Sequence, residues 1–355
     1  MLSPYDARTD YSHWDSGLWT RVLAASGVLN PLTRAPFSEA MLAGLAGGIG
    51  FMIFTFEYKE TTTASVVTRF HPGPYTENLL RRSGAAVNIQ QTGSANLAQS
   101  RLDAALDTGV PAVVRVVRGK LPWVAEDWLA DSDSVDVAVV ARDGADYLMD
   151  DGGGSLSRIS PAALAQARGS RKADKHWQAH VVEGSGTALT TQVLRQAMAE
   201  TAHGLLTQQA PPGIPPGYAK NFGILGMDSW AQRLTDGKTK RGWMRIFGDP
   251  QRSFDGMAML HGLLAGKRFS GPGALRPLYA EFLREAAAVP GVDAAALNEA
   301  AGQYLVLGAT WDALADLIGN AGEPDFEGMA VQVEAIARLE TAAAQALESA
   351  ANGAL

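Results

Sequence analysis

The sequence contains no cysteine, and this absence excludes several classes of chemistry. None of its 355 residues offers a thiol for a disulfide, a thiolate metal site, an iron–sulfur cluster or a cysteine nucleophile. Basic residues are also few: 30 Lys and Arg stand against 37 Asp and Glu, a formal net charge of −7. Because phosphate neutralisation needs clustered cations, this balance argues against a nucleic-acid partner. The opening residues show no basic segment before an apolar run, so we expect no secretory signal and a cytoplasmic protein.

Long uncharged stretches are equally scarce. Residues 40–56 lack a charged side chain over 17 positions, which is shorter than the roughly 20 that a membrane span needs. Glycines interrupt this run, and Glu39 and Glu57 rather than basic residues flank it. A buried helix, a glycine turn and a buried strand explain the run better, so we expect no membrane partner.

The composition that remains is that of a globular protein with more than one domain. Hydrophobic residues make up 46% and charged residues 19%, which are ordinary values, and the length predicts about two domains. Helix and strand signals alternate as far as Gly184-Ser185-Gly186, and alanine- and leucine-rich helical patterns follow to the end. We therefore predict an α+β domain over 1–185 and an all-α domain over 186–355.

Caps, turns and periodicity assign many elements. The strand expected at 51–58 is apolar on both faces, which predicts a central place in a sheet. The glycine-rich run 44–50 follows a helix and precedes a strand, the reverse of a phosphate loop, so we interpret it as a tight turn that allows close backbone packing. Helices are expected over 16–26, 75–83, 94–108, 294–317 and 325–351, and strands over 111–117, 135–141, 146–149 and 178–182.

Acidic residues and histidines give no metal pattern. The Asp150-Asp151 pair lacks the spacing of a calcium loop and is interpreted as part of a solvated loop. The same applies to the acidic cluster Asp127, Asp131, Asp133 and Asp136. No pair of histidines has the His-Glu-x-x-His zinc spacing. We therefore predict no metal and no cofactor.

The segment His13-Trp14-Asp15-Ser16 is the strongest chemical signal. It precedes a predicted helix, whose N–H groups stabilise developing negative charge. Asp15 or Ser16 could simply cap that helix. His13 could instead handle protons, because imidazole titrates near neutrality, and this requires its ring to face an accessible hollow.

Several blocks resemble the butirosin biosynthesis protein H family. In the N-terminal domain they are the segment 13–16, Pro36-Phe37-Ser38-Glu39-Ala40-Met41-Leu42-Ala43-Gly44 and Gly47-Gly48-Ile49-Gly50-Phe51. The helical half resembles the domain of unknown function that usually follows, through Trp230-Ala231-Gln232-Arg233-Leu234, Lys240-Arg241-Gly242-Trp243 and Arg276-Pro277-Leu278-Tyr279-Ala280-Glu281-Phe282-Leu283. The resemblance implies a papain-like, peptidase-related α+β fold up to about residue 185. It also implies amide-bond chemistry, since the namesake moves an aminoacyl group from an acyl carrier protein thioester to an aminoglycoside amine.

The sequence departs from this family at two positions. In members with that activity a cysteine follows the histidine at the start of the first helix, and a second histidine begins a later strand. Here Trp14 follows His13, and the later strand offers Val135 or Asp136. A thiolate–imidazolium pair therefore cannot form. His13 together with Asp15 resembles the branch of the family that lacks the cysteine.

Three functions remain open on this basis. The leading prediction is an acyltransferase-like or amide-forming enzyme of specialised metabolism, such as antibiotic biosynthesis, with His13 as general base and Asp15 orienting its ring. A variant makes Ser16 the nucleophile and His13 its base. The alternative is a catalytically degenerate binding or scaffold protein of a biosynthetic pathway. The predicted substrate-binding residues are Trp14, Glu39, Glu57, Arg69, His71 and Asp136.

The expected partners are a small-molecule or peptidyl substrate and an acyl carrier protein. Lys238, Lys240 and Arg241 form a basic patch that could meet an acidic carrier protein, although a solvated loop is the simpler interpretation. Aromatic residues of the helical half, such as Trp230 and Trp243, are expected in the core. A homodimer is compatible with the sequence, which does not decide the oligomeric state.

Overall fold

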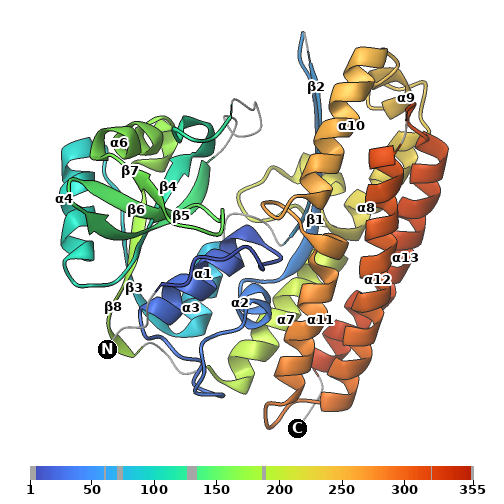
Figure 1. The fold of residues 1–355 in the computed structure, drawn as a ribbon. Helices are drawn as coiled ribbons and strands as arrows, with labels where there is room; N and C mark the ends of the chain where they lie inside the picture. The colour runs from blue at the N-terminus through green and yellow to red at the C-terminus, as the bar shows by residue number, and fades with distance from the viewer. Residues whose placement is uncertain are drawn as a thin grey trace. The chain divides into compact units, whose positions relative to one another are not determined.

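The computed structural model describes residues 5–59, 61–69, 75–125, 134–185, 189–320 and 322–352 (Figure 1). The chain forms two compact units, each made of two separate segments. The first unit comprises Met1–Ser38 and Leu80–Leu189, and the second comprises Glu39–Leu79 and Thr190–Leu355. This differs from a division at residue 185 alone, because the segment from Glu39 to Leu79 packs with the helices that follow residue 189.

An antiparallel six-stranded sheet, of order β3-β8-β4-β5-β6-β7, organises the first unit. Its strands are β3 (Ala85–Gln90), β4 (Ala112–Val117), β5 (Ser134–Asp143), β6 (Asp146–Asp150), β7 (Ser157–Ile159) and β8 (Gln178–Ser185). Its helices are α1 (Trp14–Ala25), α4 (Ala95–Leu106) and α6 (Pro161–Gly169), with short 3-10 turns at Arg118–Lys120 and Lys172–Asp174. The boundary between the two units at Leu79 and Leu80 falls within helix α3 (Tyr75–Ser83).

Local sequence signals explain these elements. Ser94 caps α4 by accepting a hydrogen bond from the Leu97 N–H, and Ser160 caps α6 in the same way. The β5–β6 hairpin turns at Gly144, whose φ of +65° suits glycine. The predicted helices at 75–83 and 94–108 and the predicted hairpin are confirmed. The sequence analysis did not predict strand β3. Five of its six residues are half-buried, so the strand has no buried face that an alternating apolar pattern would mark.

The second unit contains a two-stranded antiparallel sheet and a set of helices. The strands are β1 (Ile49–Glu57) and β2 (Thr62–Arg69). The longer helices are α7 (Thr191–Leu206), α8 (Gly223–Leu234), α10 (Pro250–Ala265), α11 (Arg276–Ala287), α12 (Ala294–Asn320) and α13 (Phe326–Asn352). Shorter helical segments are α2 (Glu39–Leu45), η3 (Pro216–Asn221), α9 (Trp243–Ile246) and η4 (Pro272–Leu275). Trp230, Trp243 and Trp311 are buried among them, which confirms the expected aromatic core.

The prediction of a central strand at 51–58 is wrong. Within the described residues, β1 forms a ladder with β2 alone, apart from a single bridge between Met52 and Phe222. Helices α7 and α8 pack against β1, where Phe51 and Ile53 are buried, but Phe54 is half-buried and Phe56 is exposed. An apolar residue at nearly every position therefore does not mean that both faces are buried inside a sheet. The glycine run before β1 is a tight turn as expected, with positive φ at Gly47 and Gly48.

The interpretation of Asp150-Asp151 as a solvated loop is also wrong. The Asp150 carboxylate is fully buried and accepts hydrogen bonds from Arg21 Nε at 2.7 Å and from the Tyr5 hydroxyl at 2.6 Å. Asp151 is nearly buried and accepts from Trp123 Nε1 at 2.7 Å. A buried carboxylate needs such partners, and they come from distant parts of the chain. Asp127, Asp131 and Asp133 lie outside the described residues.

None of the helices in the described ranges combines the length and the apolar character of a membrane span.

Candidate functional site

His13 and Ser16 meet at the start of helix α1. His13 precedes the helix with extended backbone angles, φ −136° and ψ 135°, and its carbonyl accepts from the Gly17 N–H at 2.9 Å. Its Nδ1 atom lies 3.1 Å from Ser16 Oγ, so the contact needed between a serine and its base exists. Both side chains are 0% exposed, however. The imidazole is therefore enclosed, contrary to the expectation that it faces an accessible hollow.

Trp14 links the start of helix α1 to the six-stranded sheet. Its indole Nε1 donates to the Asp136 carbonyl of β5 at 2.7 Å. The ring meets Tyr11 edge-on, with centroids 6.3 Å apart. A Cβ built on Gly152 would lie 3.1 Å from the indole, so the backbone passes close to the ring there. Trp14 thus occupies the position after the histidine and bonds directly to the strand position where the family resemblance leads one to expect a second histidine.

The Asp136 side chain forms an ion pair with Arg115. Its carboxylate accepts from Arg115 Nε at 2.9 Å, and the Arg115 guanidinium lies over the Trp177 ring at 4.6 Å. Burial lowers the pKa of Arg115, but the carboxylates of Asp136, Asp174 and Asp15 more than offset this, and its net pKa is raised. Asp15 therefore lies within electrostatic reach of Arg115. Asp136 is 5% exposed, so this pair leaves little of it open to a substrate.

Three other predicted binding residues belong to the second unit. Glu57 and Arg69 stand at opposite ends of the β1–β2 hairpin, since Glu57 pairs with Thr62 and Ile49 pairs with Arg69. Seven residue steps separate these ends, about 23 Å of strand, so the two side chains cannot line one small pocket. Glu39 opens α2 and is half-buried. His71 lies outside the described residues.

Two of these charged side chains contact a neighbouring residue. Glu57 accepts from Arg245 Nη2 at 2.7 Å. The Arg69 guanidinium lies over the Tyr75 ring at 5.1 Å. No group of three His, Asp or Glu side chains that could hold a metal ion occurs in the part of the chain that the structure describes.

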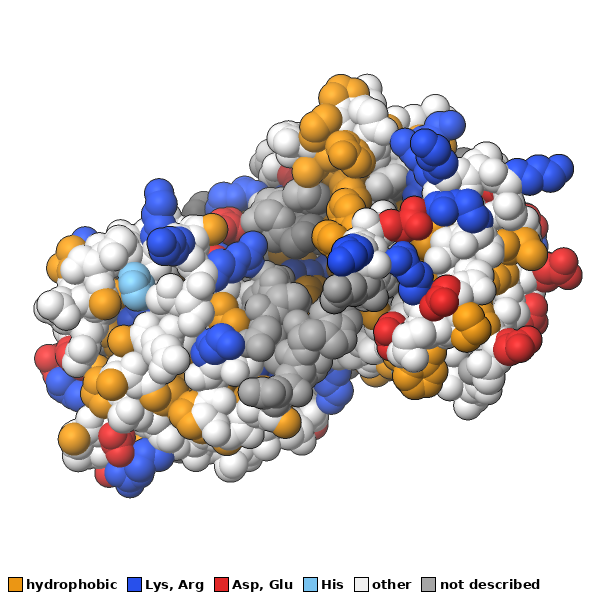
Figure 2. Space-filling model, turned by 90° about the horizontal axis from the view of Figure 1, so that it is seen from above, with side chains coloured by type: hydrophobic (Ala, Val, Ile, Leu, Met, Phe, Trp, Pro, Cys, Tyr) orange, Lys and Arg blue, Asp and Glu red, His pale blue; other side chains and the backbone are white. Residues whose placement is uncertain are grey.

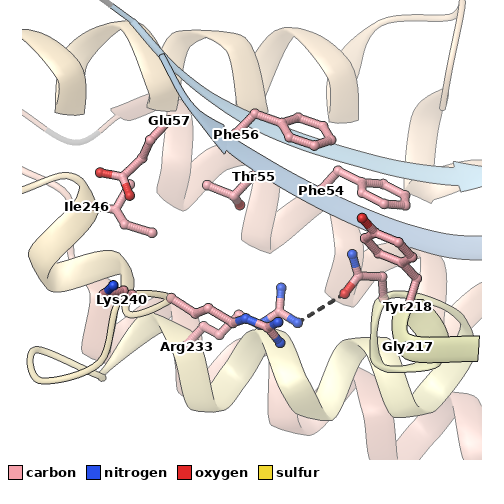
Figure 3. Close-up of a pocket in the computed structure, with 11 residues that line it drawn as sticks. Phe54, Thr55, Phe56, Glu57, Gly217, Tyr218, Arg233, Lys240 and Ile246 are labelled. Carbon is pink, nitrogen blue, oxygen red and sulfur yellow. Dashed lines mark hydrogen bonds between the residues drawn. The ribbon is translucent and has the colours of Figure 1, made fainter. Parts of the chain in front are cut away.

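A pocket that sequence reasoning missed lies in the second unit. Its volume is about 360 Å³, and residues from β1, η3, α8 and the loop before α9 line it (Figure 3). Lys240 and Arg241 of the predicted basic patch are among them. That patch was the available signal, but the Phe54 and Phe56 rings that also line the pocket come from β1, whose Glu57 is 188 positions from Arg245.

Two histidines of the first unit, the buried His180 and the half-buried His176, predict how stability depends on pH. Burial lowers the pKa of His180 on β8, and burial together with the Arg168 charge lowers that of His176. The unfolded chain therefore binds more protons between the lowered values and about 6.5. Stability should be full above about pH 6.5 and should fall as the pH drops through that window.

Thermal unfolding between pH 7.5 and 5.0 tests this prediction. We expect the melting temperature of the wild type to fall with pH, and the slope to flatten in His180→Gln and further in His176→Gln/His180→Gln. His203→Gln, at an exposed position of α7, serves as the control and should keep the wild-type slope. An unchanged slope in the double variant would contradict the prediction.

Two family models match the chain. A family model described as "Butirosin biosynthesis protein H, N-terminal" matches residues 13–152. A second, described as "Domain of unknown function (DUF4872)", matches residues 162–347, a little over half of the chain. No curated protein matches the chain.

Proposed function

Because this chain belongs to the butirosin biosynthesis protein H family, we propose that it acts in the biosynthesis of a specialised metabolite as a binding protein that forms no acyl-enzyme. The observation that carries this proposal is the 2.7 Å bond from Trp14 Nε1 to the Asp136 carbonyl. It joins the positions at which active relatives are expected to carry a thiol and a second histidine. An indole has no nucleophilic atom to offer in place of the thiol.

Burial of the remaining polar groups supports the same conclusion. His13 and Ser16 are both fully enclosed and in contact with each other. A general base must reach the proton that it removes, directly or through one water. Groups with no exposed surface do not meet a substrate in this conformation.

The papain-like assignment of the first unit is part of the proposal. In its support, α1 lies against β5 of an antiparallel sheet, and the start of the helix is bonded to that strand. This arrangement would keep the architecture of an acyl-transfer enzyme while closing the place of its nucleophile. The proposed ligands are a small-molecule or peptidyl compound of the pathway, and the proposed macromolecular partner is an acyl carrier protein.

The 3.1 Å contact between His13 and Ser16 favours a second candidate, an acyltransferase-like, amide-forming enzyme. In that reaction Ser16 Oγ would attack the thioester carbonyl, a C–O bond would form and the C–S bond would break, and His13 would pass the hydroxyl proton to the departing thiolate. The amine nitrogen would then attack the Ser16 ester, a C–N bond would form and the C–O bond would break, and His13 would return the amine proton to Ser16 Oγ. Asp15 would help to orient the base. This candidate requires an opening of the helix start that exposes both groups.

Incubation of the full chain with acyl carrier thioesters and candidate amines separates the two. We expect the wild type to consume thioester no faster than buffer, and its intact mass to stay unchanged. Native mass spectrometry should nevertheless detect non-covalent complexes with a thioester or an amine. His13→Ala should behave like the wild type in the turnover assay.

Controls decide what a positive result means. His203→Ala removes an exposed histidine of α7 and should match the wild type in every assay. Amide product from the wild type and from His203→Ala, with its loss in both His13→Ala and Ser16→Ala, would establish the enzyme and refute the binding protein. An acyl adduct on Ser16 would do the same.

A further inference from the structure

We propose that the pocket of the second unit binds an organic anion, a carboxylate or phosphate attached to an aromatic or planar apolar body. The pocket lies wholly within that unit and does not involve His13, Trp14 or Ser16. This inference therefore does not rest on the proposed function of the first unit. At about 360 Å³ the pocket falls in the range that holds small molecules.

One side of the pocket is cationic. Arg233 of α8 and Lys240 and Arg241 of the following loop line it. Within the described residues, none of these three forms an ion pair with a carboxylate. Glu57 also lines the pocket, but its charge is offset by Arg245 at 2.7 Å. An incoming ligand therefore meets a net positive surface.

Arg233 is held in place rather than left to solvent. Its Nη2 donates to Asn221 Oδ1 at 3.1 Å, and the side chain is half-buried. Burial, together with the positive charge of Arg241 nearby, lowers the pKa of the Arg233 guanidinium. Two like charges kept close together are costly in the empty protein, and a bound anion would offset that cost. Guanidinium groups recognise carboxylates and phosphates through paired N–H donors.

The opposite side of the pocket is aromatic. Phe54 and Phe56 of β1 stack with centroids 5.9 Å apart and an angle of 7° between their planes. The centroid of the Tyr218 ring lies 6.0 Å from that of the Phe54 ring. Figure 3 shows these rings grouped at one end of the pocket, with Arg233 across from the strand. Such a wall suits a flat apolar group.

The aromatic wall is open to a ligand. Phe56 is 47% and Tyr218 46% exposed, so both rings can contact a ligand. Figure 2 shows Lys and Arg side chains beside hydrophobic ones on one face of the molecule. A ligand with an anionic head and an apolar body would satisfy both features.

Small probes added to the full chain test the proposal by calorimetric titration. The probes are benzoate, phenyl phosphate, neutral benzamide and inorganic phosphate. We expect benzoate or phenyl phosphate to bind at least about tenfold more tightly than both benzamide and inorganic phosphate. The tighter-binding of the two aromatic anions identifies the preferred head group. No binding of either aromatic anion at about 10 mM overturns the proposal. Equal affinity for benzamide or for inorganic phosphate overturns it too.

Variants place the binding in this pocket. Arg233→Met and Arg241→Met should each weaken the preferred anion about tenfold, and Phe56→Ala should weaken phenyl phosphate or benzoate but not inorganic phosphate. Arg241 is exposed, so its variant tests binding without disturbing the Arg233–Asn221 contact. Lys238→Met changes an exposed cation that does not line the pocket and should have no effect. Unchanged affinity in Arg241→Met, or an equal loss in Lys238→Met, overturns the proposal.

Discussion

Replacing Arg276 by methionine is expected to lower the free energy of unfolding by about 3–5 kcal/mol, because it leaves a buried carboxylate without its partner. Arg276 and Glu340 are both 0% exposed, and Arg276 Nη2 lies 3.0 Å from Glu340 Oε2. The same guanidinium donates to the carbonyl oxygens of Gly50, Thr68 and Ala274. One side chain therefore ties both strands of the hairpin to helices α11 and α13.

Urea denaturation followed by tryptophan fluorescence measures this effect, since the Trp311 ring lies 5.4 Å from the Arg276 guanidinium. Arg284→Met, an exposed change in the same helix, is the matched control and should alter stability by less than about 0.5 kcal/mol. The double variant Arg276→Met/Glu340→Leu should recover part of the loss, because no charge is then left buried. A loss in Arg276→Met no larger than that of the control would show that the pair is not the anchor described.

Replacing Gly48 by alanine is expected to cost about 2–5 kcal/mol. Gly48 has a φ of +65°, where an L side chain costs about 1–2 kcal/mol. A Cβ built there would lie 2.3 Å from the Tyr279 ring, and Tyr279 is 1% exposed. Forcing a methyl group into a packed core costs a further 1–3 kcal/mol or so. The close approach of the turn to α11 thus depends on the missing side chain.

Gly213→Ala separates the two contributions in the same unit. Gly213 also has a positive φ, +84°, but no atom lies within 4 Å of the position that its Cβ would take. We expect this control to lose only the backbone part, about 1–2 kcal/mol. Equal losses in the two variants, measured by urea denaturation, would mean that contact with Tyr279 contributes nothing.

The candidate site shows how far local reasoning reaches. The His13–Ser16 contact spans three positions of one helix start, and the sequence was enough to foresee it as one option. The bond from Trp14 to the Asp136 carbonyl spans 122 positions, and no local pattern encodes it. Yet it is this bond, together with the burial of His13, that favours binding over acyl transfer.

Errors in the predicted fold have the same origin. The apolar pattern of β1 was interpreted as burial of both faces inside a sheet, but helices pack against part of the strand and Phe56 is exposed. In the sequence, Asp150 cannot be distinguished from an exposed loop carboxylate, because its partner Arg21 is 129 positions away. Burial of a polar group depends on partners that hydrophobic periodicity does not describe.

By itself, the sequence determined the absence of thiol chemistry, the family of both halves, and most helices and strands. These follow from residue types, caps and glycines that act over a few neighbouring positions. Only the tertiary structure decided that residues 39–79 join the helical unit, that His13 is enclosed, and that cations near residue 240 face aromatic rings near residue 55. Those outcomes depend on contacts between distant segments, whose free energy is realised only once the chain has folded.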